Sequence, residues 1–217
     1  MSPPNLKLHG YWRSSAAYRV RIALHMKNLA FEQQTHDLRT GEQRETAYLA
    51  LAPQGLVPAL EADGRILTQS LAIIEWLEER YPEPQLLPPD AEGRAVVRAM
   101  AGLIACDIHP LGNLRVLQAL RRDFNADQLA VEAWAARWIA DGFAALETLI
   151  IQHGAGFAYG GDLTLADCCL VPQVYNAERF KVDLGPYPRL RAAAERAKAL
   201  PAVQAAHPYR QPGAVLV

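Results

Sequence analysis

The residues whose types and positions could support chemistry begin with a serine pair at the junction of two predicted elements. Ser14 and Ser15 follow a short apolar strand and precede a segment, residues 17–24, whose apolar side chains have helical spacing. The first N–H groups of a helix have no partner within the helix and carry a partial positive charge, so this junction favours an anion. A serine here can also serve only as a helix cap. Spacing alone leaves both interpretations open.

Two other segments could present backbone groups to a ligand. Val57-Pro58 opens a predicted strand, and an X-Pro bond adopts the cis form at modest cost, which would turn the preceding N–H and C=O outward. An ordinary trans bond is the alternative. Gln69-Ser70 precedes a predicted helix. Ser70 at its N-cap and the N–H groups behind it could bind a carboxylate, to which Gln69 could add hydrogen bonds.

Five further side chains are candidates for ligand binding only when they are considered together. Taken singly, a glutamine or histidine is most often an ordinary surface or core group, and an arginine is most often solvated or paired with a carboxylate. Guanidinium groups nevertheless match carboxylates with two parallel hydrogen bonds. A His-Pro pair within a helical pattern predicts a kink. The five side chains are Gln43, His109, Arg13, Arg115 and Arg179.

These candidates are positioned by two regions with different periodicity. The first, residues 1–81, predicts the element order βαβαββα, with strands near 6–11, 30–35, 58–60 and 65–67 and helices over 17–24, 43–51 and after Ser70. Ala62-Asp63-Gly64 predicts a hairpin between the last two strands. The expected sheet therefore begins parallel and ends antiparallel, in an α/β domain.

A proline-rich linker, residues 82–90, separates this region from an all-α one, residues 91–217. Helical patterns there cover 91–122, 126–152, 164–178 and 187–199. Trp134 and Trp138 lie on one face, in a stripe that is expected to be core. Thr164 and Asp167 have the spacing of a capping box, which indicates a role in folding. The adjacent cysteines, Cys168 and Cys169, are expected to be inert packing residues.

Composition limits the classes of function. The chain has 217 residues with 22 basic and 23 acidic side chains, and 51% of its residues are hydrophobic, which suits a folded core and argues against a polyanion-binding surface. Three cysteines, two of them adjacent, make a poor disulfide framework and fit a reducing compartment. The sequence has no signal-peptide pattern, no apolar run of about 18 residues and no metal-ligand spacing. We therefore expect a cytoplasmic protein without a metal, nucleic-acid or membrane partner.

Residues 11–24, with the sequence YWRSSAAYRVRIAL, resemble the signature of zeta-class glutathione transferases, the family of maleylacetoacetate and maleylpyruvate isomerases. The other motifs with counterparts in that family are residues 56–60, 69–70, 107–110 and 176–184. Because several motifs occur in the family's order, the resemblance covers essentially the whole chain. It implies a thioredoxin-like domain followed by a helical bundle that contributes the second-substrate pocket, with glutathione as cofactor and a homodimer as the assembly.

The resemblance also implies roles for individual residues. Ser14, with Ser15 close by, would stabilise the glutathione thiolate, and Arg179 would join them in catalysis. The implied glutathione-binding residues are Ser14, Ser15, Gln43, Val57, Pro58, Gln69, Ser70, His109 and Asn113. The implied residues for a dicarboxylate keto acid are Arg13, Arg115 and Arg179.

The implied reaction is cis–trans isomerisation in tyrosine or related aromatic catabolism. The thiolate adds to the double bond of a maleyl keto acid, the bond rotates in the resulting enolate, and elimination leaves the fumaryl isomer with glutathione unconsumed. The choice between maleylacetoacetate and maleylpyruvate stays open.

Two alternatives remain. One is a general glutathione transferase that conjugates or dehalogenates small electrophiles. The other is a non-catalytic glutathione-binding module, which stays possible because Ala16 stands where many relatives have cysteine. Disulfide exchange is disfavoured, because the Ser-Ser-Ala-Ala turn contains no thiol.

Overall fold

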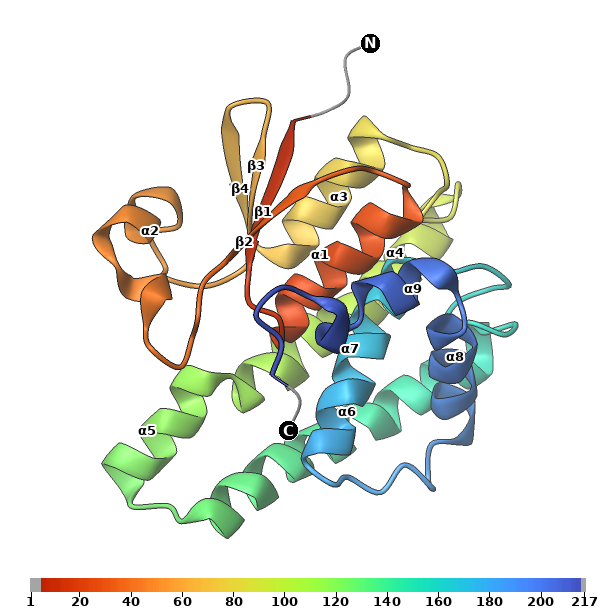
Figure 1. Cartoon of the computed structure of the whole chain (residues 1–217). Helices are drawn as coiled ribbons and strands as arrows, with labels where there is room; N and C mark the ends of the chain where they lie inside the picture. Colours follow the sequence, from red (N-terminus) through yellow and green to blue (C-terminus); the bar gives the residue numbers. More distant parts are fainter. Residues whose placement is uncertain (1–4, 216–217) are drawn as a thin grey trace. The chain divides into compact units, whose positions relative to one another are not determined.

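The computed structural model describes residues 5–215 and divides them into two compact units (Figure 1). The first comprises the chain as far as Leu86 together with residues from Ala199 onward, and the second comprises Leu87–Lys198. The sequence-derived boundaries assign residues 199–217 to the helical region instead. In the structure this segment groups with the sheet because its helix α9 (Pro201–Ala206) packs on α1 (Ser15–Met26).

A four-stranded mixed sheet organises the first unit. Its strands are β1 (Leu6–Gly10), β2 (Glu32–Thr35), β3 (Ala59–Ala62) and β4 (Arg65–Thr68), in the spatial order β2-β1-β3-β4. β1 is parallel to β2 and antiparallel to β3, and β3 is antiparallel to β4. Asp63 and Gly64 close the hairpin with positive φ angles of 49° and 79°, as a tight two-residue turn requires. The predicted βαβαββα order and the mixed sheet are confirmed.

Helices lie on both sides of these strands. α1 and α3 (Ser70–Arg80) pack side by side, and α2 (Thr46–Leu51) lies on the other side of the strands in Figure 1. The single helix predicted over 43–51 is instead a 3-10 turn, Glu42–Arg44, followed by α2. Glu45 has extended backbone angles and separates the two.

A buried lysine joins α1 to α3 and to the chain that follows α3. The Lys27 side chain is fully buried, and its Nζ lies 2.7 Å from Glu78 Oε2. The same nitrogen donates to the carbonyls of Tyr81, at 2.6 Å, and Pro84, at 3.0 Å. The Glu78 carboxylate in turn accepts the N–H of Leu86. Because these hydrogen bonds replace the water that both charges lose, the pair can be buried without leaving a charge uncompensated.

The second unit consists of helices. They are α4 (Ala91–Gly102), a π-helical turn (Leu103–Ile108), a 3-10 turn (His109–Gly112), α5 (Leu114–Phe124), α6 (Gln128–His153), α7 (Leu165–Arg179) and α8 (Pro188–Lys198). The continuous helix predicted over 91–122 is therefore wrong, whereas the kink predicted at His109-Pro110 is confirmed. Pro110 has no N–H to continue the ladder, and Asn113 caps a new helix with its side chain.

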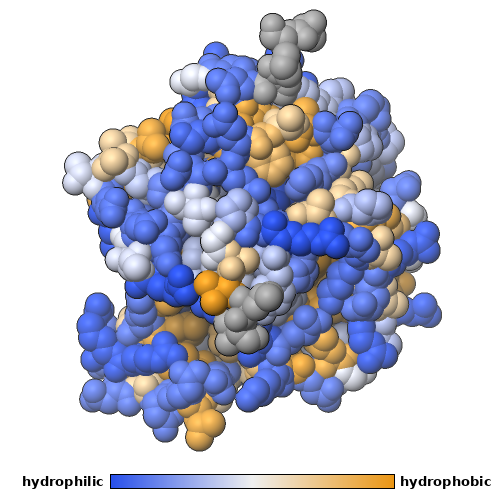
Figure 2. Space-filling model, in the orientation of Figure 1, coloured by the Kyte–Doolittle hydropathy of each residue, from blue (hydrophilic) through white to orange (hydrophobic). Residues whose placement is uncertain are grey.

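The same stretch also corrects the expectation that the chain has no apolar run long enough to span a membrane. Residues within Ala91–Phe124 contain a window that is long and apolar enough to cross a membrane by length and composition. Core helices of globular proteins pass the same test. Here Val97, Ala101 and Ile104 are buried within the helical unit. The face of the molecule in Figure 2 is mostly hydrophilic, with hydrophobic residues scattered among the polar ones.

The core of the helical unit is built on α6 and α7. Cys168 and Cys169 are fully buried, which confirms their packing role. On α6, Phe143 and Leu146 are also fully buried, but Trp134 and Trp138 are only partly buried. The expectation that both tryptophans belong to the core is wrong, because the buried stripe of α6 runs through Val131, Ala135 and Ile139, and both tryptophans lie beside it.

The predicted capping box of Thr164 and Asp167 is present at the start of α7, and Asp167 is fully buried. One Asp167 oxygen accepts the N–H of Ala158 at 2.8 Å. The other accepts the N–H and the hydroxyl of Thr164, at 2.9 and 3.0 Å. Burial raises the pKa of Asp167 to about 6. The side chain therefore connects the start of α7 to the loop before it.

We expect Asp167→Ala to lower the free energy of unfolding by about 2–4 kcal/mol at pH 7, because three buried donors lose their acceptor. The raised pKa adds a pH dependence. This group's stabilising contribution is fully present below about pH 4 and is lost as pH rises through about 6. The stability difference between the unaltered chain and Asp167→Ala should therefore be larger by about 2 kcal/mol at pH 4 than at pH 7. Urea unfolding at both pH values measures it.

Asp127→Ala is the matched control, because Asp127 caps α6 through one bond to Ala130 N at an exposed position. Its loss should cost about 1 kcal/mol at either pH. Equal effects of the two substitutions would contradict the role given to Asp167.

Candidate functional site

Strand register brings three of the candidate segments to one end of the sheet. His9 of β1 pairs with Ala59 of β3, and Ala59 pairs with Thr68 of β4. The chain therefore leaves β1 toward Ser14, enters β3 from Val57-Pro58 and leaves β4 toward Gln69 at the same edge. Residues that are far apart in sequence are adjacent here because the ladder aligns the three strand ends.

Ser14 is the N-cap of α1. Its backbone is extended, and its Oγ accepts the N–H of Ala17 at 3.2 Å. Since a hydroxyl that accepts one hydrogen bond keeps its own hydrogen, Ser14 can still donate to a ligand. Ser14 is half-buried, whereas Ser15 is 5% exposed. The capping interpretation of Ser14 is thus confirmed, and it leaves the hydroxyl hydrogen available.

A buried arginine that sequence reasoning missed fixes the turn before Ser14. Arg21 is 1% exposed, and its guanidinium donates to the carbonyl of Trp12 and to the carbonyl of Ala206, each at 3.0 Å. The sequence signal was the charge itself, which interrupts an apolar run between Val20 and Ile22. Arg21 thereby ties the serine turn to α9.

Arg13 lies beside a charged pair on the neighbouring loop. Arg39 Nη2 lies 2.6 Å from an Asp37 carboxylate oxygen, and Arg39 Nε donates to the same group. The hydrogen bonds from Arg39 lower the pKa of Asp37, and the charge of Arg13 lowers it further. This arrangement was not anticipated, because Arg13 lies on a different loop from Asp37 and Arg39 and only the fold brings it near them.

The Val57-Pro58 bond is cis, which decides between the two forms that the sequence left open. Tyr48 supports Leu56, the residue before Val57, since the Tyr48 hydroxyl donates to the carbonyl of Leu56 at 2.7 Å. Val57 itself packs against a buried cluster formed by Tyr48, Ala52 and Ala59. Both the backbone and the side chain at this position are therefore held by contacts of α2 and β3.

The third segment differs from its prediction in one respect. The N-cap of α3 is Gln69, with a positive φ of 71°, and Ser70 is the first helical residue. Ser70 is 6% exposed, and its Oγ accepts a bond from the buried Arg19 at 3.2 Å. Gln69 is exposed and donates to Gln54. No side chain caps α3, so its first N–H groups remain open to an anion.

Gln43 lies in the 3-10 turn between β2 and α2. Its side-chain oxygen is buried and has no hydrogen-bond partner among residues 5–215. An oxygen in that state is suited to accept a bond from a ligand.

The remaining candidates lie in the helical unit. His109 is half-buried at the start of the 3-10 turn, and the side chain of Asn113 accepts the N–H of Arg115 at 3.1 Å as the N-cap of α5. Arg115 is exposed. Arg179 is exposed at the end of α7, where its guanidinium donates to Asn176 Oδ1 at 3.3 Å. The prediction for Asn113 missed this capping role.

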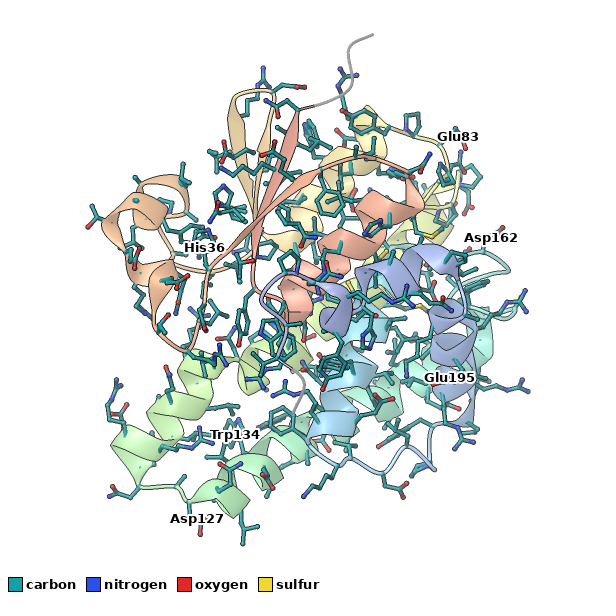
Figure 3. The ribbon with its side chains drawn as sticks, in the orientation of Figure 1. His36, Glu83, Asp127, Trp134, Asp162 and Glu195 are labelled. Atoms are coloured by element: carbon teal, nitrogen blue, oxygen red, sulfur yellow. The ribbon has the colours of Figure 1, made fainter. Side chains whose placement is uncertain are left out.

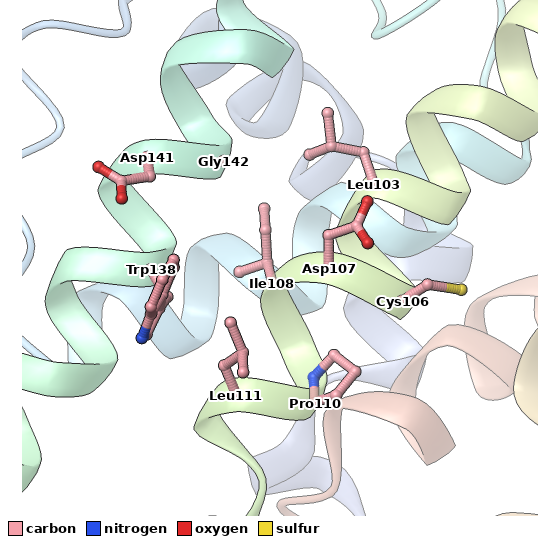
Figure 4. A pocket seen from close by; sticks show the side chains of 9 residues that line it. All are labelled: Leu103, Cys106, Asp107, Ile108, Pro110, Leu111, Trp138, Asp141 and Gly142. Carbon is pink, nitrogen blue, oxygen red and sulfur yellow. The ribbon is translucent and has the colours of Figure 1, made fainter.

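A cavity of about 560 Å³ lies in the same unit, between the π-helical turn and α6 (Figure 4). Gly142 permits the close approach of the two elements, because a Cβ there would lie 2.3 Å from the Ile108 side chain. None of the predicted site residues lines this cavity. Its walls are Leu103, Cys106, Asp107, Ile108, Pro110, Leu111, Trp138, Asp141 and Gly142.

Two family models match this arrangement of a mixed sheet and a helical unit. The glutathione S-transferase N-terminal domain matches residues 8–85, and the glutathione S-transferase C-terminal domain matches residues 118–206. The mixed four-stranded sheet followed by a helical unit is thus the fold of a glutathione S-transferase.

Similar proteins narrow this class. The chain is 50% identical over 210 residues to maleylacetoacetate isomerase of Pseudomonas aeruginosa, covering 95% of this chain and 98% of that protein. A holo structure of maleylpyruvate isomerase, a bacterial zeta-class enzyme, is 47% identical with a TM-score of 0.94, covering 96% and 100%. Maleylacetoacetate isomerase from Anaeromyxobacter dehalogenans, solved with dicarboxyethyl glutathione and citrate in its active site, is 48% identical with a TM-score of 0.89, covering 100% of both chains. The chain belongs to this zeta-class isomerase family.

Proposed function

We propose that this chain isomerises maleyl keto acids, such as maleylacetoacetate or maleylpyruvate, with glutathione as cofactor. The observation that carries the proposal is the Ser14 hydroxyl, which accepts the N–H of Ala17 and keeps its hydrogen for a thiolate at the positive end of α1. The hydrogen bond and the helix field both favour the ionised sulfur of glutathione. Family membership supports the choice of glutathione.

The end of the sheet offers groups for the rest of the tripeptide. The backbone of Val57, before cis Pro58, would bind the cysteinyl part of glutathione. Gln69, Ser70 and the first N–H groups of α3 would bind the γ-glutamyl carboxylate. Gln43 would contact the end of glutathione opposite the γ-glutamyl group. His109 and Asn113 would add contacts from the helical region, which follows the thioredoxin-like domain, residues 1–81, and the linker, residues 82–90.

The proposed reaction conserves glutathione. The thiolate forms a C–S bond to the double bond of the substrate, and the displaced electron pair moves onto the keto oxygen as an enolate. The former double bond can now rotate, and return of the electron pair expels the thiolate from the trans isomer. Dicarboxyethyl glutathione, which the Anaeromyxobacter relative binds, contains the same bond from sulfur to a dicarboxylate skeleton. Arg13, Arg115 and Arg179 would hold the carboxylates during rotation and stabilise the enolate.

We further propose a cytoplasmic homodimer. The relatives named maleylacetoacetate isomerase support a place in tyrosine degradation. Sedimentation of the purified chain tests the dimer.

Purified protein with a small amount of glutathione should convert an excess of maleylacetoacetate or maleylpyruvate into the fumaryl isomer, because the thiol is regenerated in each turnover. Chromatographic separation of the isomers and titration of free thiol measure both quantities. Thiol loss with chlorinated acids and no isomer turnover would instead favour a conjugating or dehalogenating transferase. Glutathione binding without either reaction would indicate a non-catalytic module.

Ser14→Ala should lower kcat about 100-fold or more, because one preorganised donor to the thiolate is lost, while glutathione binding remains measurable. Ser15→Ala is the comparison, since Ser15 is more deeply buried at the adjacent position. Kinetics at saturating glutathione and the ultraviolet absorbance of the bound thiolate report the effect. A larger loss in Ser15→Ala would assign thiol activation to Ser15.

Arg179→Gln should raise KM for the keto acid about 10-fold to 100-fold through loss of a charge-assisted carboxylate contact, with little change in the Kd for glutathione. Arg191→Gln, at an exposed position on α8, is the control. Steady-state kinetics with each substrate varied in turn separates the two constants. An unchanged KM for the keto acid would remove Arg179 from the substrate site.

A further inference from the structure

The segment between β2 and β3, residues 36–58, carries both Gln43 and Val57, and most of its residues are exposed or half-buried. Within α2, which lies in this segment, the buried residue is Tyr48, with 2% exposure. Figure 3 shows the segment beside the strands, with His36 at its start. Tyr48 is therefore one of the residues that anchor the segment, together with the buried Ala52.

Tyr48 supports Val57 in two ways. Its hydroxyl donates to the carbonyl of Leu56 at 2.7 Å, immediately before Val57 in the chain. Its ring belongs to the buried cluster on which the Val57 side chain packs. Burial raises the pKa of Tyr48 to about 12, so the phenol stays protonated and donates this bond throughout the neutral range.

A row of polar side chains fixes the Tyr48 ring against the sheet. The ring lies 4.3 Å from the His36 ring, centroid to centroid. His36 Nε2 is 2.9 Å from His9 Nδ1, and His9 Nε2 is 2.6 Å from Glu61 Oε1. Because the carboxylate can only accept, His9 donates from Nε2, and one hydrogen links His9 Nδ1 to His36 Nε2. The row thus runs from β3 through β1 to the segment.

The same hydroxyl bond closes the segment onto itself. Gly55 has a positive φ of 61° and reverses the chain between α2 and Leu56. A Cβ on Gly55 would lie 3.0 Å from the backbone oxygen of Gln43. Gly55 therefore lies against the Gln43 turn, and the Tyr48 hydroxyl binds Leu56, which stands between Gly55 and Val57 in the chain.

We propose that Tyr48 is a positioning residue for glutathione, because its bond to Leu56 fixes the backbone of Val57 and the adjoining Gln43 turn in the binding conformation. Tyr48 thereby sets the affinity for glutathione and leaves the rate of the chemical step unchanged. This inference rests on the proposed function, since it assigns Val57 and Gln43 to the glutathione site.

Tyr48→Phe tests the inference, because it keeps the ring and removes only the hydroxyl. Calorimetric titration with glutathione should show a Kd about five- to tenfold higher, the effect of losing one hydrogen bond. Turnover at saturating glutathione should stay within about twofold. Hydrogen exchange should become faster in residues 42–58. Tyr187→Phe is the matched control, since the Tyr187 hydroxyl donates to the Ala140 carbonyl at 3.0 Å in the helical unit, and its Kd should not change.

The outcomes separate the two hypotheses. If the unaltered chain binds no glutathione, the proposed function and the inference both fail. If it binds glutathione and Tyr48→Phe binds it equally well, the inference alone is overturned. A fall in turnover at saturating glutathione, or an equal rise in Kd for Tyr187→Phe, would also overturn the positioning role. Faster exchange confined to residues 42–58 together with the rise in Kd would support it.

Discussion

The pairing of β1 with β3 is the constraint on which the candidate site depends. β1 is the strand that leads into the serine turn, and β3 is the strand that the cis proline opens, so their register decides which backbone groups face each other. β4 adds the start of α3 to the same edge. A shift of the register by one residue would turn Leu8 and Leu60 out of the core. The buried side chains therefore fix the site indirectly, through the alignment that they impose.

Local signals predicted much of the fold. The strands, the hairpin, the serine cap of α1 and the capping box of α7 all depend on residues that are neighbours in the chain, and each is present. The break near Pro110 was expected only as a kink, because the sequence does not show that Asn113 has its side chain turned back to cap a new helix. The N-cap of α3 was misplaced by one residue, because Gln69 adopts a positive φ that is uncommon for its type.

Long-range partners could not be predicted. Arg19 and Arg21 in α1 are of a residue type that is mostly exposed, yet both are buried. Their guanidinium groups find acceptors on α3 and α9, which are about 50 and 185 residues away in the chain. Tyr48 resembles an ordinary core aromatic until its hydroxyl is seen against Leu56. In each case the partner is supplied by the tertiary fold, so a pattern of spacing does not reveal it.

The Lys27 ammonium group limits which insertions and deletions this chain can accept during evolution. Connections between domains usually tolerate insertions and deletions, because their backbone is solvated. Here the carbonyls of Tyr81 and Pro84 are both hydrogen bonded to one buried nitrogen, and Leu86 is bonded to the carboxylate that neutralises it. Adding or removing a residue in this stretch would move carbonyl acceptors away from the buried ammonium group and leave its hydrogen bonds incomplete. The length of this connection should therefore be preserved even where its residue types vary.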